Sequence, residues 1–588
     1  MTRPSCTKAV VLVACATSIG AWAVARAAVM LPTFAPAWVG SSTVASGFGH
    51  SVSFAGDVNG DGYDDVVVGA PWFSNGQTFE GKAFAYHGSA AGLSATPNWS
   101  LENNVALATV GSAVAGVGDV NGDGYDDVVV GAEQHSNGQH FEGRAQLFLG
   151  SATGLAAAAS WTVESNDSGS HFGFDVAAAG DVNNDGFCDV LVGAPESNAG
   201  GTAYVYHGSP TGLPVVASAI RTGPHLDAAF AYESRCAGDV NGDGYDDVVV
   251  GVPGFTNGQQ SEGGAFVYAG SATGLGAAPM WTTESNLAGI WHGLSVGDGG
   301  DFNADGYSDF AVGAWLYEAD KWKEGRVEVY EGSPTGPSAA PTWTQVGGQV
   351  GASFGSSLAN AGDVNGDGID DLLVGASEYD DIPASYIQGR MFLYLGSANG
   401  LEPTATWAGG NTGTAMFLGM SVDGDADVNG DGFCDVIGGG ENFDNGSQHA
   451  EVHHGGPFAA VTPYGVAKSV NPLTTNAPRL TTTAAPAIGA TSNLNVSGGV
   501  IFGNAILFAG FEPASIPFDL GTLNVLPTYV VYLPKFDAQG KTSIPVPLPP
   551  LAALQDLSVY FQVVQPNFQA PGFYHLTMTN GLRWVLGT

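Results

Sequence analysis

A nine-residue acidic segment recurs seven times along the chain, and its residue types are those that bind calcium. The first copy reads Asp57-Val-Asn-Gly-Asp-Gly-Tyr-Asp-Asp65. If its residues are numbered 1 to 9, oxygen-bearing side chains stand at positions 1, 3, 5 and 9. Calcium takes about six to eight oxygen ligands. We therefore expect these four side chains and the backbone carbonyl of position 7 to bind one ion in each copy.

The seven copies predict up to seven Ca²⁺ ions. Successive copies start 62, 62, 58, 62, 62 and 64 residues apart, and position 6 is Gly in all of them, where the chain must turn sharply. The predicted ligands are Asp57, Asn59, Asp61, Tyr63 and Asp65; Asp119, Asn121, Asp123, Tyr125 and Asp127; Asp181, Asn183, Asp185, Phe187 and Asp189; Asp239, Asn241, Asp243, Tyr245 and Asp247; Asp301, Asn303, Asp305, Tyr307 and Asp309; Asp363, Asn365, Asp367, Ile369 and Asp371; and Asp427, Asn429, Asp431, Phe433 and Asp435.

Other interpretations of these segments are possible but fit less well. An EF-hand needs a bidentate Glu at position 12, where the first copy has Val68. Magnesium usually takes fewer protein oxygens than such a loop offers. A run of Asp, Asn and Gly can also be a simple β-turn. Three carboxylates within one loop repel each other, so we expect the empty loop to be strained or partly protonated.

The residues around each acidic segment predict a four-stranded unit. A pair such as Phe48-Gly49 precedes the segment, and an apolar run such as Val66–Val68 follows it and ends in Gly-Ala-Pro. A third run, such as 83–86, and a Trp segment at Trp99 complete the repeat. Four short strands in about sixty residues are typical of one propeller blade. The sequence therefore predicts an all-β fold, with a seven-bladed β-propeller over residues 28–457.

The two ends of the array predict how the ring closes. Trp38 lies 19 residues before Asp57, in the place that a preceding blade's Trp would take, yet no blade precedes it. The seventh copy ends at Gly455-Gly456 without a Trp segment. We expect the segment around Trp38 to be the outer strand of blade seven, which would leave the ring without an unpaired edge.

The series FG…DxNxDGxxD…GAP resembles the FG-GAP repeats of the integrin α-subunit N-terminal domain. The resemblance implies a seven-bladed propeller with calcium in hairpin loops on its lower face. Integrin α chains carry intact loops in only some blades, whereas all seven are intact here, with Asn in place of the frequent Asp at position 3. Nothing resembles the inserted metal-dependent adhesion domain of some integrins, so adhesion by that route is not supported.

The chain ends predict export and a second domain. Residues 1–27 resemble a signal peptide, with Arg3 and Lys8 before an apolar stretch and a small-residue cleavage site at residues 25–27. We therefore expect a secreted, extracellular or cell-surface protein, with a lipidated Cys15 as the alternative. Residues 458–490 are predicted to be a linker and residues 491–588 a small β-sandwich-like domain. No segment of the mature chain is predicted to span a membrane.

Composition excludes some partners and leaves the cysteines open. Acidic residues outnumber basic ones by 56 to 16, which argues against nucleic acid and anionic membranes. Of the cysteines that follow the leader, Cys188 and Cys236 are the candidate disulfide and Cys434 is left over. The alternative interpretation is three small buried side chains.

Strand parity predicts a second functional surface. The calcium loops are turns between strands 1 and 2, so the connections between strands 2 and 3 lie on the opposite face. These connections are rich in aromatic residues, and the candidate ligand-binding residues are Trp72, Phe79, Phe141, Trp315, Tyr317, Trp322 and Tyr379. Our hypothesis is that this face binds a protein or a glycan; the alternative is that the rings only pack the loops.

These observations favour a non-enzymatic binding or adhesion scaffold. The sequence contains no Ser/His/Asp order, metalloprotease helix or phosphate loop. The recurring Glu102, Glu164 and Glu284 follow their Trp at a fixed interval, which is typical of a structural role. A secreted polysaccharide lyase or hydrolase on a propeller scaffold, and a passive surface or matrix protein, are the alternatives.

Overall fold

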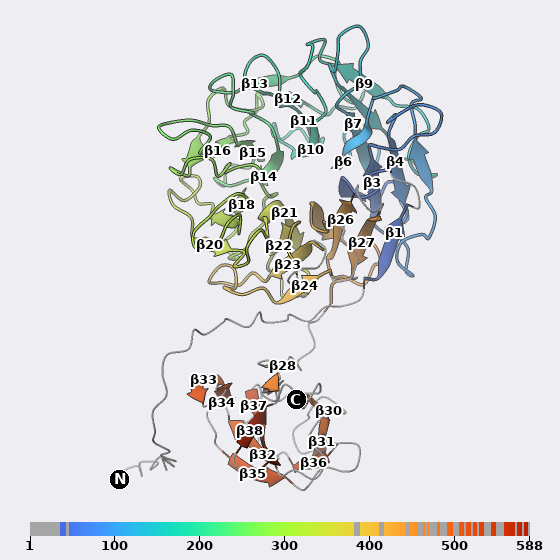
Figure 1. Ribbon diagram of the computed structural model, residues 1–588. Coiled ribbons are helices and arrows are strands. Elements are labelled where there is room, and N and C mark those ends of the chain that lie inside the picture. Colours follow the sequence, from blue (N-terminus) through green and yellow to red (C-terminus); the bar gives the residue numbers. More distant parts are fainter. Residues whose placement is uncertain are drawn as a thin grey trace, which may run out of the picture. The chain divides into compact units, whose positions relative to one another are not determined.

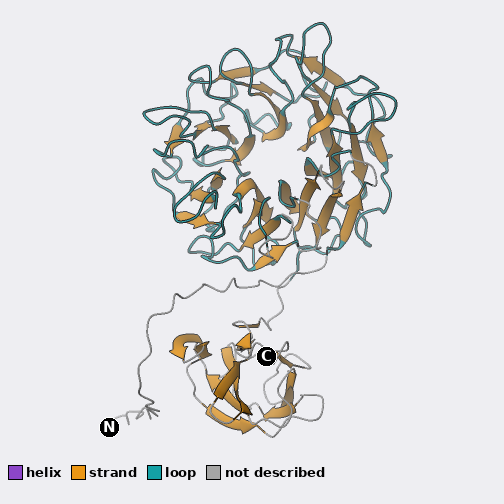
Figure 2. Ribbon diagram, in the orientation of Figure 1, coloured by secondary structure: helices purple, strands orange, loops and turns teal. Residues whose placement is uncertain are grey.

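The computed structural model describes residues 36–456 apart from 43–45, 381–387, 411–416 and 443–446, and beyond residue 456 it describes the backbone of individual strands. All regular secondary structure in the described part of the chain is β-strand (Figure 2). The chain divides into two compact units. One is Leu31–Phe458, and the other combines Met1–Met30 with Ala459–Thr588.

The unit Leu31–Phe458 is a ring of seven antiparallel sheets around a common centre (Figure 1). Blades 1 to 3 contain β2 (Val52–Gly56), β3 (Asp65–Ala70), β4 (Lys82–Tyr86) and β5 (Trp99–Leu101); β6 (Val110–Gly118), β7 (Asp127–Ala132), β8 (Arg144–Phe148) and β9 (Trp161–Glu164); and β10 (Asp175–Gly180), β11 (Asp189–Ala194), β12 (Thr202–Tyr206) and β13 (Ala219–Thr222). Blades 4 to 6 contain β14 (Ser234–Gly238), β15 (Asp247–Val252), β16 (Gly264–Tyr268) and β17 (Trp281–Glu284); β18 (Phe310–Ala314), β19 (Arg326–Tyr330) and β20 (Trp343–Val346); and β21 (Phe354–Gly362), β22 (Asp371–Ala376), β23 (Arg390–Tyr394) and β24 (Trp407–Gly409). Blade 7 contains β25 (Ser421–Ala426), β26 (Asp435–Asn442), β27 (Ser447–His453) and β1 (Trp38–Ser41).

Ring closure occurs as predicted from the two ends of the array. Strand β1 pairs antiparallel with β27, with Trp38 opposite Val452 and Ser41 opposite His449. The outer strand of blade 7 therefore comes from the N-terminal end of the ring. Because β1 covers the edge of β27, the last blade does not expose unpaired backbone groups there.

The second strand of each blade is buried on both faces. Val66, Val67 and Val68 of β3 are fully buried, which explains why this run is apolar throughout and does not alternate. Gly69 ends the run where the next blade approaches closely. A Cβ atom at Gly69 would lie 2.1 Å from the carbonyl oxygen of Gly111. The glycines of the FG and GAP motifs thus allow the backbones of adjacent blades to touch.

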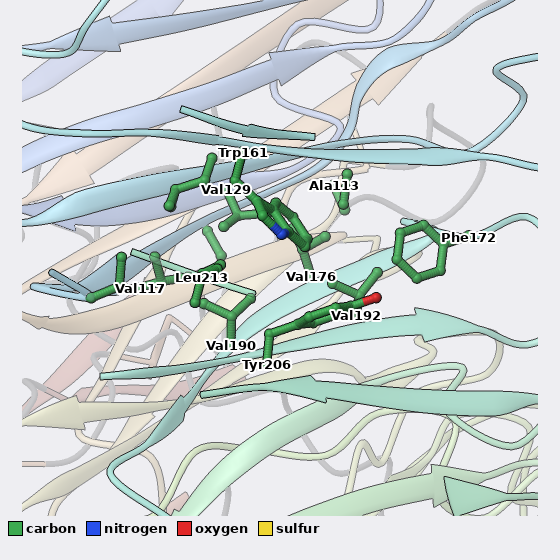
Figure 3. Close-up of a cluster of buried hydrophobic side chains, with 14 of the residues drawn as sticks. Ala113, Val117, Val129, Trp161, Phe172, Val176, Val190, Val192, Tyr206 and Leu213 are labelled. Carbon is green, nitrogen blue, oxygen red and sulfur yellow. The ribbon is translucent and has the colours of Figure 1, made fainter. Parts of the chain in front are cut away.

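Aromatic and aliphatic side chains fill the space between neighbouring blades. Figure 3 shows the cluster between blades 2 and 3, where Trp161 and Tyr206 meet edge to face with ring centroids 4.9 Å apart. Val190 and Val192 of β11 pack into the same cluster, as does Phe172 of the FG motif. Burial of such side chains stabilises a fold by about 1.5–3 kcal/mol each.

Five outer-strand tryptophans also join their blade to the next by a hydrogen bond. The indole Nε1 of Trp38 donates to Ser94 O at 3.0 Å, and that of Trp161 donates to Pro214 O at 2.8 Å. Equivalent bonds run from Trp99, Trp281 and Trp343. Blade 3 has no Trp, and there Arg221 Nε donates to Gly276 O at 2.7 Å, so a different side chain makes the same link.

Two details of the ring differ from the simplest expectation. Blade 5 has three regular strands, and its innermost segment keeps only the isolated bridges Val296–Val312 and Gly300–Asp309. Three glycines between residues 297 and 300 weaken a strand at this point. Cys188, Cys236 and Cys434 are all free thiols, so the candidate disulfide is not formed. Burial raises the pKa of each thiol.

The second unit also consists of strands. They are β28 (Pro463–Tyr464), β29 (Lys468–Ser469), β30 (Arg479–Thr482), β31 (Thr491–Ser497), β32 (Ala505–Gly510), β33 (Pro513–Phe518), β34 (Gly521–Val525), β35 (Tyr529–Leu533), β36 (Thr542–Pro547), β37 (Ser558–Ala570), β38 (Phe573–Met578) and β39 (Gly581–Val585). The linker and the β-sandwich-like domain stay predictions. The signal peptide and Cys15 lie outside the described residues. A search of the described residues finds no helix with the length and hydropathy needed to cross a membrane.

We predict that the closing strand is required for the stability of the ring. Trp38→Ala should destabilise the fold by about 3–5 kcal/mol, because it removes a large buried side chain and the bond to Ser94. Trp161→Ala is the matched control for an internal blade junction, and a similar loss is expected there. Deletion of residues 36–41 should lower Tm further and promote association through the exposed edge of β27. A melting temperature unchanged by that deletion would contradict this role.

Candidate metal-binding loops and the opposite loop face

Each acidic segment forms the turn between the first and second strands of its blade. In blade 1 the carboxylate at position 1 organises the turn. Oδ1 of Asp57 accepts the N–H groups of Gly60 and Asp61 at 2.7 and 3.0 Å, and Oδ2 accepts that of Gly62 at 2.7 Å. Gly62 has φ +88°, a conformation that favours glycine, which explains Gly at position 6.

All seven loops use position 1 in the same way. The carboxylates of Asp119, Asp181, Asp239, Asp301, Asp363 and Asp427 accept the N–H groups of positions 5 and 6 in their own loops. Blades 3 and 5 have Asn184 and Ala304 at position 4, with φ of 53° and 58°, where the other copies have Gly. In the described loops of these two blades the position 1 carboxylate keeps the bonds from positions 5 and 6, but the position 4 N–H does not donate to it as Gly60 donates to Asp57.

The carboxylate at position 9 belongs to the most buried acidic residue of each loop. Asp65 is fully buried at the start of β3. Its Oδ2 accepts the N–H of Val58 at 3.2 Å, and its Oδ1 accepts the N–H of Gly88 beyond the third strand at 2.8 Å. This residue thus joins the metal loop, the second strand and the turn between strands 3 and 4. The same two bonds occur in all seven blades.

Burial raises the pKa of every position 9 carboxyl. Desolvation is the largest cause, the two backbone hydrogen bonds oppose it, and the negative charges at positions 1 and 5 add to it. The pKa rises to about 7 for Asp65, Asp127, Asp189, Asp247 and Asp435, and to about 8 for Asp309 and Asp371. The partly protonated empty loop expected from the sequence is consistent with these values.

The donor set matches calcium, but the side chains do not yet converge on a common point. Among the described residues, no group of three Asp, Glu, His or Cys side chains is arranged to hold a metal ion. In blade 2 the Asn121 amide turns its nitrogen toward Asp123 Oδ2 at 3.0 Å, and in blade 4 Asn241 Nδ2 lies 3.4 Å from Asp247 Oδ2. A rotation of these amides would present oxygen instead. Positions 1, 3, 5 and 9 lie around one turn. Binding of one ion by all four side chains would require some of these side chains to rotate.

Hydrogen bonds assign the other connections to the two faces of the ring. The turn between strands 3 and 4 of blade 1 lies beside the metal loops, since Ser89 N–H donates to Val428 O. The connection between strands 2 and 3 lies beside the connection to the next blade, since Thr109 N–H donates to Phe79 O. The aromatic segments thus occupy the face opposite the metal loops, as strand parity predicts.

The seven candidate ligand-binding side chains divide into exposed and packed residues. Trp322 is 62% exposed and Phe79 is 43% exposed. Tyr379 instead packs on Phe392, with ring centroids 5.4 Å apart, and belongs to the core between blades 5 and 6. The aromatic rings of this face therefore differ: some are exposed to solvent, and others pack against the loops and the core.

The remaining candidates are half-buried and have polar neighbours. Trp72 donates through Nε1 to Glu441 Oε1 at 3.4 Å. Phe141 lies 3.7 Å from the ring of His140. The guanidinium of Arg326 lies 4.3 Å above Tyr317, and the Lys323 ammonium lies 4.1 Å above Trp315.

Trp291 is a further exposed aromatic residue that the sequence analysis did not identify. It is 40% exposed, and its ring centroid lies 6.5 Å from that of Trp315. Trp291 belongs to the connection between blades 4 and 5, whereas the aromatic residues predicted from the sequence all lie in connections between strands 2 and 3. Val350, in the connection between blades 5 and 6, is 62% exposed. Trp322, Trp291 and Val350 therefore lie on the connection between strands 2 and 3 of blade 5 and on the two connections that join blade 5 to its neighbours.

Comparisons with known proteins agree with this architecture. The FG-GAP repeat model matches residues 48–86, 110–148, 233–268 and 354–392, and an FG-GAP-like repeat model matches residues 181–250. Each of the four FG-GAP matches starts at or near the FG motif; three end at the last residue of a third strand, and the fourth ends within β23. Each of these four matches lies within one blade and contains its acidic loop, whereas the FG-GAP-like match contains the acidic loops of blades 3 and 4.

Several curated relatives are integrin α subunits. Integrin alpha pat-2 of Caenorhabditis briggsae is 33% identical over 217 residues, which is 33% of this chain and 17% of the relative. Mouse integrin alpha-IIb is 35% identical over 158 residues, and human integrin alpha-7 is 34% identical over 191 residues; these matches cover 26% and 32% of this chain. The chain spans 15% of the length of each of these two relatives. The seven-bladed ring is thus an integrin-α-like FG-GAP β-propeller.

Proposed function

We propose that this chain is an exported calcium-binding propeller that acts as a binding or adhesion scaffold and not as an enzyme. The observation that carries the proposal is the buried carboxylate at position 9, which recurs in seven loops beside two further Asp side chains. A buried carboxylate is costly unless a cation or a proton neutralises it. Calcium would supply the positive charge, and the oxygens of positions 1, 3, 5, 7 and 9 would coordinate it.

Calcium has a structural role in this proposal. Position 9 holds the second strand and the turn between strands 3 and 4 together, so an ion bound there strengthens a junction within each blade. No step of substrate chemistry is assigned to the ion. The acidic composition of the chain fits the binding of cations and argues against nucleic acid as a partner.

We predict that calcium raises the melting temperature of the chain in proportion to the ions bound. An ion that binds only the folded state stabilises it by mass action, by about 2.7 kcal/mol per site at one hundred times Kd. Differential scanning fluorimetry with calcium and with a chelator, combined with metal counting, should show up to seven ions and a large loss of Tm on chelation. A metal-free protein with the same Tm in both conditions would contradict the proposal.

We predict an inverted pH dependence for the metal-free protein. The pKa of each position 9 carboxyl is about 7 or 8 in the folded state, against its ordinary value of 3.8 in the unfolded chain. Between pH 4 and 8 the folded state therefore binds more protons than the unfolded state, and stability falls as the pH rises through the folded pKa. With chelator, Tm at pH 5.5 should exceed Tm at pH 8 by about 5 °C or more.

Saturating calcium should reduce or reverse that difference, because the ion replaces the proton as the partner of the carboxylate. Asp65→Asn removes one such carboxyl and retains its shape. The variant should bind one ion fewer than the wild type at pH 8. With chelator, its Tm should change less between pH 5.5 and pH 8, because one titrating carboxyl is missing. A chelated protein that becomes more stable from pH 5.5 to pH 8 would show that these carboxyls do not behave as described.

We further propose that the face opposite the metal loops binds a protein ligand, with a glycan as the alternative. The exposed rings of Trp322, Trp291 and Phe79 support this, because large exposed aromatic side chains are uncommon on a soluble surface and frequent at binding sites. The partly buried rings, among them Trp315 and Tyr379, support the loops that carry them. Export to the cell surface or medium would place this face in contact with extracellular partners.

Binding at this face predicts a selective effect of aromatic substitutions. Pull-down from extracellular material and glycan-array screening provide the candidate ligands. Trp322→Ala should weaken any specific interaction at least tenfold, or about 1.4 kcal/mol. Val216→Ala is the control, since Val216 is 74% exposed in the connection between strands 3 and 4, on the other face. Retention of every interaction by Trp322→Ala would refute the binding face, and turnover of a polysaccharide by the wild-type chain would favour the enzyme alternative.

A further inference from the structure

Position 8 of the acidic segment connects each metal loop to the loop of the preceding blade. In four copies this residue is an aspartate whose Oδ2 accepts the N–H of position 1 in the neighbouring loop. The distance from Asp126 Oδ2 to Asp57 N is 2.8 Å, and that from Asp246 Oδ2 to Asp181 N is 2.7 Å. Asp370 and Asp64 make the same bond to Asp301 and Asp427, at 2.9 and 2.7 Å. None of these four aspartates is among the predicted metal ligands.

The preceding loop provides space for this side chain. Gly56 stands directly before Asp57 with φ +67°, and a Cβ atom there would lie 2.2 Å from Oδ2 of Asp126. Gly180 has the same relation to Asp246, at 2.3 Å. The position 7 ring reinforces the contact, since a Cβ atom at Gly60 would lie 2.6 Å from the ring of Tyr125. The glycine backbone of one loop thus packs directly against the position 7 and position 8 side chains of the next loop.

The remaining three junctions of the ring lack the carboxylate. Position 8 is Cys188 in blade 3, Ser308 in blade 5 and Cys434 in blade 7. These three junctions still have a backbone hydrogen bond. The N–H of position 8 donates to the carbonyl oxygen of position 1 in the preceding loop, with N···O distances of 3.2–3.3 Å. A carboxylate bond therefore links loops 7, 1 and 2, loops 3 and 4, and loops 5 and 6, and it is absent between those three groups.

We propose that the position 8 aspartates couple calcium binding between adjacent loops, so that the seven sites fill as three groups. This inference rests on the proposed calcium binding. Asp126 stands between two predicted ligands of its own loop, the Tyr125 carbonyl and the Asp127 carboxylate, and its side chain holds the backbone of Asp57, the first ligand of the preceding loop. An ion in either loop fixes one end of this hydrogen bond and thereby orders the other loop.

Two physical effects give the coupling its sign. The first ion fixes main chain that the second loop also uses, so the second ion loses less conformational entropy on binding. The carboxylate of Asp126 also lies between the two loops, near Asp57 and Asp119, and its negative charge offsets the repulsion between two divalent ions. Both effects favour positive cooperativity within a group. Neither operates through a position 8 carboxylate at the Cys188, Ser308 and Cys434 junctions. At the last of these, Asp425 Oδ1 instead lies 3.6 Å from Cys434 Sγ and beside Gly362, and no bond from it to the Asp363 N–H is present in the described ring.

Calcium titration calorimetry of the full chain tests this inference. Asp126→Ala removes the bond between loops 1 and 2, and we expect it to reduce the coupling between those sites at least about fivefold and to lower the steepness of the titration. Ser308→Ala is the matched control at a junction without the carboxylate and should titrate as the wild type does. Ser308→Asp creates a new link between loops 4 and 5, because Gly238 leaves the same space there, and should increase the cooperativity.

The outcomes separate this inference from the proposed function. A wild-type chain that binds no calcium overturns the proposed function. A wild-type chain that binds calcium at independent sites, or equal effects of Asp126→Ala and Ser308→Ala, overturns only the coupling. If Asp126→Ala fails to fold, Ser308→Asp alone decides, since unchanged cooperativity in that folded variant contradicts the proposal.

Discussion

The buried carboxylate at position 9 is the interaction on which each blade depends. In blade 1, Asp65 accepts one N–H from its own metal loop and one from the turn after the third strand. Those two bonds determine where the second strand begins and how the third strand ends. Its negative charge is excluded from water, so the junction is complete only when a proton or a cation is present. The same requirement recurs around the ring, so the proposed calcium binding would connect the stability of the fold to the ions.

The contacts between blades follow from the small residues next to this junction. Gly69 allows the backbone of Gly111 to approach within contact distance, and Gly56 leaves room for the side chain of Asp126. Outer-strand tryptophans of five blades add a hydrogen bond to the next blade, including the bond from Trp38 that closes the ring. The high glycine content of the chain therefore reflects close packing of adjacent sheets as well as tight turns.

Much of this architecture was predictable because the sequence contains seven copies of the same repeat. The strand order, the position of the acidic loops and the closure by Trp38 all follow from the spacing of identical motifs. Single blades are less predictable. The missing Trp of blade 3 is replaced by Arg221, and the inner segment of blade 5 loses regular pairing at its glycines. A repeat pattern contains no signal for such local substitutions, since each depends on the neighbouring blade.

The loops on the two faces of the ring lead to the same conclusion: the sequence pattern predicts on which face a loop lies, but not how its side chains pack. Strand parity places the aromatic segments on the correct face, but exposure of each ring depends on contacts that composition does not encode. Trp322 is exposed and Tyr379 is packed, although both stand in equivalent connections. Likewise, the role of Asp126 was not apparent from the sequence, because position 8 is neither a predicted metal ligand nor identical in all copies.

A crystal structure of the full chain grown with calcium, with the ions located by anomalous scattering, tests the central claim most directly. The account predicts an ion in each acidic loop, bound by the position 9 carboxylate together with oxygens of positions 1, 3, 5 and 7. Loops that contain no ion, with Asp65 and its equivalents held only by their backbone N–H groups, would contradict it.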